Sequence, residues 1–90
     1  MGLDIIDLRE KIDSIDDELV RLFHERMFIS GDIAQYKMRN GLEIYDPERE
    51  KIKLADVLNK SDPVLHDYVK ALYSRIFELS RMYQTSRGRS

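Results

Sequence analysis

Apolar side chains recur at alternating spacings of four and three through the first 39 residues of this 90-residue chain. The positions of the pattern are Leu8, Ile12, Ile15, Leu19, Leu22, Arg26, Ile29, Ile33 and Tyr36. A heptad pattern sustained for about four repeats, with no proline in it, is typical of one long helix that packs against another. We therefore expect a helix over residues 4–39. Asn40 and Gly41 should end it, because both tolerate the left-handed conformation of a C-terminal cap.

An aspartate followed by proline occurs twice in the rest of the chain, at Asp46 and Asp62. Each aspartate can cap a helix, and the proline then occupies the first helical position, where its missing N–H costs nothing. We expect helices over residues 47–59 and 63–84. No segment alternates with the period of two that a strand requires. The predicted fold class is all-α, with one long helix and two short ones.

Length and composition exclude several classes of protein. Ninety residues allow a single domain, 1–90, in which the polar residues 85–90 should form a disordered tail. Without cysteine the chain has no disulfide framework or thiolate metal site, and two histidines cannot form a zinc site by themselves. The balance of 15 basic and 17 acidic residues argues against a nucleic-acid partner. No membrane-spanning stretch or signal peptide is recognisable, so we expect a cytoplasmic protein.

The long helix predicts a homodimer. A helix of about 36 residues is about 54 Å long, and two short helices of the same chain cannot cover it. We infer that its seam meets a second copy of itself in an intertwined dimer. An ordinary coiled-coil dimerisation module would show the same periodicity, so the heptads alone do not distinguish the two.

Three cations on the long helix do not fit a plain coiled coil. Arg26 occupies the seam, where a cation usually needs a dedicated anion, although a lone polar residue there can also simply fix the register. Lys37 projects within about 20° of Arg26 and roughly 16 Å away, so both can converge on one small anion. Arg9 lies about 25 Å before Arg26 and cannot reach that ligand within one chain. In antiparallel helices that cross near residue 20, Arg9 of one chain would face the region between Arg26 and Lys37 of the other.

Polar residues on the two shorter helices have simple structural explanations when each is taken alone. Asp46 fits a helix cap, and Arg49 and Glu50 in the first turn fit ordinary surface charge. Ser80 and Gln84 are four residues apart and so share one helix face, which could be a solvated one.

Together these positions resemble the all-helical class of chorismate mutases over about residues 5–84. The resemblance rests on the order and spacing of the matching stretches, which are Leu8-Arg9-Glu10-Lys11-Ile12, Ile15-Asp16, Glu25-Arg26, Lys37, Asp46-Pro47-Glu48-Arg49-Glu50, Ser80 and Gln84. It implies an intertwined dimer of three-helix chains. The connection from Asn59 to Pro63 looks shorter than in some relatives, which would alter the lid of the pocket.

The resemblance also implies a role for each matching residue. Arg26, with Arg9 of the partner chain, would bind the two carboxylates of chorismate. Lys37 would contact a carboxylate and the ether oxygen, to which Gln84 would donate a second hydrogen bond. Glu50 would accept from the ring hydroxyl. The residues expected to line the pocket beside them are Asp46, Arg49 and Ser80, of which Arg49 and Ser80 would help to hold the substrate.

The implied activity is that of an intramolecular isomerase of aromatic amino acid biosynthesis, which rearranges chorismate to prephenate. This pericyclic step needs no nucleophile, metal or cofactor. It needs the substrate held in a compact chair-like conformer and donors aimed at the ether oxygen, where negative charge develops. Three alternatives remain: an isochorismate pyruvate-lyase of the same fold, a regulatory or dimerisation domain of a larger shikimate-pathway enzyme, and a plain coiled-coil scaffold.

Overall fold

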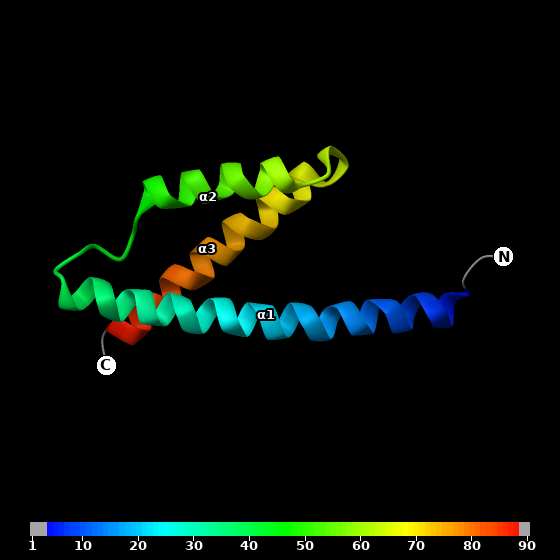
Figure 1. The fold of residues 1–90 in the computed structure, drawn as a ribbon, viewed down its shortest axis with the longest axis horizontal. Coiled ribbons are helices and arrows are strands. Elements are labelled where there is room, and N and C mark those ends of the chain that lie inside the picture. The colour runs from blue at the N-terminus through cyan, green and yellow to red at the C-terminus, as the bar shows by residue number, and fades with distance from the viewer. Residues whose placement is uncertain (1–3, 89–90) are drawn as a thin grey trace.

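Three α-helices and one short 3₁₀ turn make up the computed structural model of the chain, which describes residues 4–88 (Figure 1). Their bounds are Ile5–Arg39 for α1, Pro47–Lys60 for α2, Pro63–Leu65 for the 3₁₀ turn η1, and His66–Gly88 for α3. The all-α class and the division into one long and two shorter helices are confirmed.

The ends of α1 follow from local hydrogen bonding. The side chain of Asp4 accepts a hydrogen bond from the backbone N–H of Asp7 at 2.9 Å, which satisfies one of the free donors of the first turn. At the other end Asn40 caps the helix, and Gly41 adopts a left-handed φ of 64°. The predicted stop at Asn40-Gly41 is therefore confirmed.

Both Asp-Pro pairs form the predicted caps. The Asp46 carboxylate accepts from the backbone N–H of Arg49 at 3.0 Å, and that of Asp62 accepts from the N–H of Val64 at 2.9 Å. The third segment differs from a uniform helix in its first turn, because Pro63–Leu65 form a 3₁₀ turn before α3 begins. Such tighter turns are common at helix N-termini.

Residues 85–88 were expected to belong to a disordered tail, but in the structure they continue α3. Residues 89–90 lie outside the described residues. The physical reason is tertiary: the last turns of α3 lie on α1, where the side chain of Arg87 approaches Gly31. Packing of this kind stabilises helical turns that composition alone leaves marginal.

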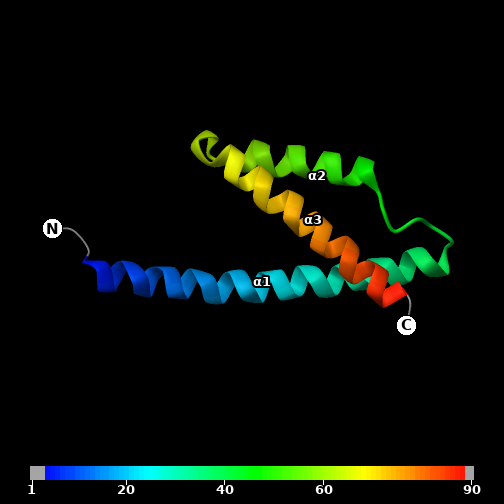
Figure 2. The ribbon, with the colours of Figure 1, turned by 180° about the vertical axis from the view of Figure 1, so that it is seen from behind.

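The helices form an open, elongated arrangement of 59 × 28 × 14 Å. The C-terminal half of α3 crosses the C-terminal half of α1, and α2 packs on α3 (Figures 1 and 2). Between the described residues of α1 and α2 no Cα atoms come within 8 Å of each other. Among the described residues α3 therefore packs against both α1 and α2 and connects them.

Small residues allow α3 to approach α1. The buried residues of α1 are Ser30, Gly31 and Ala34. A Cβ atom added at Gly31 would lie 2.9 Å from Cε2 of Tyr83. Glycine at this position lets the two helices approach closely without displacing the Tyr83 ring.

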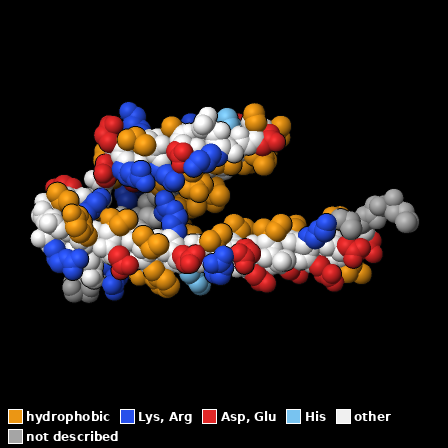
Figure 3. Space-filling view, in the orientation of Figure 1, with side chains coloured by type: hydrophobic (Ala, Val, Ile, Leu, Met, Phe, Trp, Pro, Cys, Tyr) orange, Lys and Arg blue, Asp and Glu red, His pale blue; other side chains and the backbone are white. Residues whose placement is uncertain are grey.

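Much of the apolar seam of α1 is uncovered. Among the described residues the buried apolar side chains are Ala34 and Phe77. The N-terminal seam residues are 43–58% exposed, namely Leu8, Ile12, Ile15, Leu19 and Leu22, and we call them the α1 stripe. Figure 3 shows hydrophobic side chains along the edge of α1 that faces α2. None of the described helices has both the length and the apolar character of a membrane span.

Candidate active site

A cavity of about 310 Å³ lies between α1, α2 and the C-terminal half of α3. Seven of the eight predicted site residues line it, namely Arg26, Lys37, Asp46, Arg49, Glu50, Ser80 and Gln84. The eighth, Arg9, is exposed on the N-terminal part of α1 and does not line this cavity. Residues from three helices and the α1–α2 loop are therefore brought together within one chain.

Arg26 is held by α3 rather than by an acid. Its Nη1 donates to the Ser80 hydroxyl at 2.9 Å, and its guanidinium lies 5.8 Å from the centre of the Phe77 ring. Ser80 is buried, and its hydroxyl also contacts the sulfur of Met27 at 3.8 Å. No acidic side chain among residues 4–88 pairs with Arg26. The seam cation is thus oriented and remains available for an anionic ligand.

Lys37 connects the end of α1 to the following loop. Its half-buried ammonium donates to the carbonyl oxygen of Ile44 at 3.0 Å. An ammonium group has three donors, so this bond leaves two for a ligand. The bond also holds the loop at the mouth of the cavity.

Gln84 is buried against α1 with one donor already used. Its Nε2 donates to the backbone carbonyl of Ser30 at 3.1 Å, and only 9% of the residue is exposed. This bond identifies the side-chain nitrogen, because a carbonyl can only accept. The second N–H of the amide can serve a ligand in the cavity.

Glu50 is paired with a residue that the sequence analysis missed. Nη1 of Arg81 donates to both carboxylate oxygens of Glu50, at 2.6 and 2.5 Å. The Arg81 guanidinium also lies 5.0 Å from the centre of the Tyr45 ring. Arg81 directly follows Ser80, but nothing in the sequence spacing links it to Glu50 on another helix.

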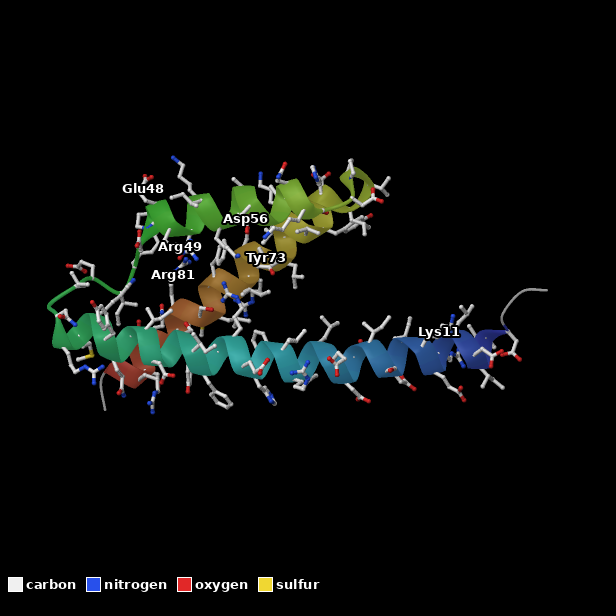
Figure 4. The ribbon with its side chains drawn as sticks, viewed as in Figure 1. Lys11, Glu48, Arg49, Asp56, Tyr73 and Arg81 are labelled. Carbon is white, nitrogen blue, oxygen red and sulfur yellow. The ribbon has the colours of Figure 1, made fainter. Side chains whose placement is uncertain are left out.

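Cations dominate the wall of the cavity. Besides Arg26, Lys37 and Arg49, it includes Lys53 and Arg81, against the carboxylates of Asp46 and Glu50. Lys53 was also missed, and it pairs with Asp56 of α2 at 3.2 Å. Figure 4 shows Arg49 and Arg81 directed into the space between α2 and α1, and Glu48 directed away from it. The excess of positive charge favours a ligand with more than one negative charge.

Comparisons with known proteins agree with this geometry. The family model described as chorismate mutase type II matches residues 8–85. The chain is 43% identical over 47 residues to a chorismate mutase of Methanocaldococcus jannaschii, covering 52% of this chain and 48% of that protein. It is 34% identical over 83 residues to a bifunctional chorismate mutase/prephenate dehydratase of Buchnera aphidicola, covering 90% of this chain and 22% of that protein.

A T-protein of Haemophilus influenzae is 48% identical over 44 residues, which are 49% of this chain and 12% of that protein. The chain therefore spans less than half the length of each of these curated relatives. No solved structure matches it significantly.

Proposed function

The chain belongs to the type II chorismate mutase family, and on that basis we propose that it converts chorismate to prephenate in a site completed by a second copy of itself. The observation that carries this proposal is the convergence of seven predicted site residues on one cavity of about 310 Å³. Chorismate carries two carboxylates, and the wall of the cavity is rich in cations.

Arg26 is suited to bind one substrate carboxylate, and Arg49 to help hold the substrate. A guanidinium can grip a planar carboxylate through two parallel hydrogen bonds, which fix its orientation as well as its position. The bond from Arg26 to the buried Ser80 hydroxyl orients its guanidinium before the substrate arrives. Positioning of this kind lowers the barrier by holding the reactive conformer of the substrate.

Lys37 and Gln84 are suited to stabilise the transition state. The bond to the ether oxygen breaks ahead of carbon–carbon bond formation, so negative charge develops on that oxygen. Donors that are already in place stabilise this charge more than they stabilise the ground state. Each of the two residues keeps a free donor after its bond to the backbone of α1 or the following loop. Glu50 would accept the hydrogen bond of the ring hydroxyl.

The exposed α1 stripe supports the homodimer. Its five apolar side chains are 43–58% exposed and lie in the N-terminal half of α1, whose end extends beyond α3 and α2 (Figure 2). Complete burial of such a side chain is worth about 1.5–3 kcal/mol, so covering the half-exposed stripe would contribute several kcal/mol. A second copy has an equally long stripe and would cover it over its whole length.

The same pairing gives Arg9 a function. Arg9 follows the first stripe residue, Leu8, and is remote from the cavity of its own chain. In an antiparallel pair that crosses near residue 20, it would reach the partner's cavity between Arg26 and Lys37. The resemblance assigns it to a substrate carboxylate, which would complete the cationic lining.

The experiment that tests this function follows the loss of chorismate absorbance and identifies prephenate by its acid conversion to phenylpyruvate. We expect turnover by the purified chain and a loss of about 100-fold or more in kcat/KM in Arg26→Ala, because an oriented charge is removed. Arg21→Ala is the matched control, since Arg21 pairs with Glu18 and Glu25 on an exposed face of α1. A folded chain without turnover would contradict the proposal, and isochorismate would then be the next substrate to test.

A further inference from the structure

The ion pair between Glu50 and Arg81 differs from the ion pairs that Arg21, Lys53, Lys60 and Arg75 form. Each of those pairs lies within one helix. The Glu50–Arg81 pair instead joins the first turn of α2 to the C-terminal half of α3, at the wall of the cavity. An ion pair that joins two helices at the wall of a cavity can fix the position of one helix relative to the other.

Glu50 has open space on two sides. A second cavity of about 350 Å³ lies on the other side of the α2–α3 contact. Glu50, Phe77 and Arg81 line both cavities, so they form the wall between them. Because Glu50 borders hollow space on both sides, the direction of its carboxylate depends strongly on its hydrogen-bond partner.

Arg81 is itself fixed from two directions. Nη1 donates to both oxygens of Glu50, while the guanidinium carbon lies over the Tyr45 ring of the α1–α2 loop, 5.0 Å from its centre. Stacking on an aromatic ring and bonding to a carboxylate are both favourable for a guanidinium and can be satisfied together. Arg81 thus links the loop, α2 and α3 at one point.

The pair leaves Glu50 able to act on a ligand. A carboxylate has about four lone-pair directions, of which the two bonds from Arg81 use two. Glu50 can therefore accept a further hydrogen bond from the cavity while Arg81 holds it. The side chains of Arg81 and Glu50 are 34% and 25% exposed. Ion pairs with that much contact with water stabilise the fold only weakly, so the main consequence of this pair is geometric.

We propose that Arg81 is a positioning residue for the reaction, which fixes the direction of the Glu50 carboxylate so that it can accept a hydrogen bond from the substrate hydroxyl. This inference rests on the proposed function. Its physical basis is the sensitivity of rate to alignment, since a misplacement of about 1 Å can cost about 100-fold.

The test is a double-mutant cycle measured by steady-state kinetics on the full chain. Arg81→Met removes the charge and keeps the aliphatic stem, and Glu50→Gln removes the carboxylate charge. We expect Arg81→Met to lower kcat about 10- to 100-fold with a smaller change in KM. In the Glu50→Gln background the same substitution should change kcat less than about threefold, because the group that Arg81 positions is already lost. Arg81→Lys should recover part of the activity.

Two controls separate positioning from stability. Arg75→Met removes a cation from the same helix that pairs with Glu78 and is 61% exposed, so kcat should be unchanged. Thermal unfolding of Arg81→Met should remain close to that of the wild type.

Equal losses in both backgrounds would overturn the inference, because Arg81 would then act independently of Glu50. An unchanged kcat in Arg81→Met, with an active wild type, would also overturn it while leaving the proposed function intact. An inactive wild-type chain would overturn both together.

Discussion

The two halves of α1 have the same heptad periodicity but opposite surroundings. In the N-terminal half the α1 stripe is apolar and half exposed. In the C-terminal half the buried residues are small, namely Ser30, Gly31 and Ala34, and α3 lies directly on them. The seam positions of this half include Arg26, which faces the cavity beside Lys37.

This difference fits a helix with two roles, one in the proposed dimer and one in the cavity. A regular apolar heptad is suited to a partner helix of equal length, which only another chain can supply. Small residues instead permit a close crossing by α3 of the same chain, which brings Ser80 and Gln84 to the cations of α1. The N-terminal half would bind the partner, and the C-terminal half would bind the substrate.

The largest effect is expected from charge in the α1 stripe. Ile15→Asp combined with Leu19→Asp should abolish the dimer, because two carboxylates would have to be buried without partners. Sedimentation should then show a monomer, and chorismate turnover should be lost with it. Phe28→Asp is the matched control, since Phe28 is 61% exposed and lies on the opposite face of α1. A double variant that stays dimeric would show that the stripe is not the interface.

A mixed dimer tests whether the two halves act in the same site. Arg9→Ala and Arg26→Ala chains should each be inactive alone. In a heterodimer one site combines the intact Arg26 of one chain with the intact Arg9 of the other. Random mixing of equal amounts should therefore restore about a quarter of the wild-type activity. Activity that stays at the level of the separate variants would contradict a shared site.

Gly31→Ala tests the close crossing in the C-terminal half. The new Cβ would meet Tyr83 at 2.9 Å. Overpacking of a close contact costs about 1–3 kcal/mol, whereas alanine gains about 1 kcal/mol over glycine in a helix. We expect a net loss of about 1 kcal/mol in unfolding free energy and a lower kcat, because Tyr83 adjoins Gln84. Thermal and urea unfolding measure the first effect, and Asp17→Ala on the exposed face of α1 is the control. A higher Tm than the wild type would show that Tyr83 turns away freely.

The smallest effect is expected at Asp56, which belongs to neither half of α1. Hydrogen bonds from Lys60 and Lys53 lower the pKa of Asp56 below its usual 3.8. The interactions of ionised Asp56 with the two lysines therefore stabilise the fold at pH values above the unfolded-state pKa of Asp56. This contribution is lost as the pH falls through the folded-state pKa of Asp56. Asp56→Asn should lower Tm slightly at neutral pH and leave it unchanged in strong acid. A difference that grows on acidification would contradict this sign.

Local features of the sequence were sufficient for much of the fold. The caps at Asp46 and Asp62 and the stop at Asn40-Gly41 were predictable because each depends on residues within one turn. The end of α3 was not predictable in this way, because residues 85–88 continue the helix where its last turns pack on α1. The seven predicted residues that line the cavity could be grouped only as a set, through the family resemblance that their order and spacing carry.

The sequence by itself determined that the chain forms three helices and that α1 has an apolar seam longer than the rest of the chain can cover. The family resemblance added the prediction of a shared site, and seven of its eight residues line one cavity. Periodicity, capping and spacing are local properties, and they are readable without the fold. Only the tertiary structure decided how α3 crosses α1 and that Arg81 pairs with Glu50. These two residues are 31 positions apart on different helices. Their contact depends on the path of the backbone between them, which no local pattern specifies.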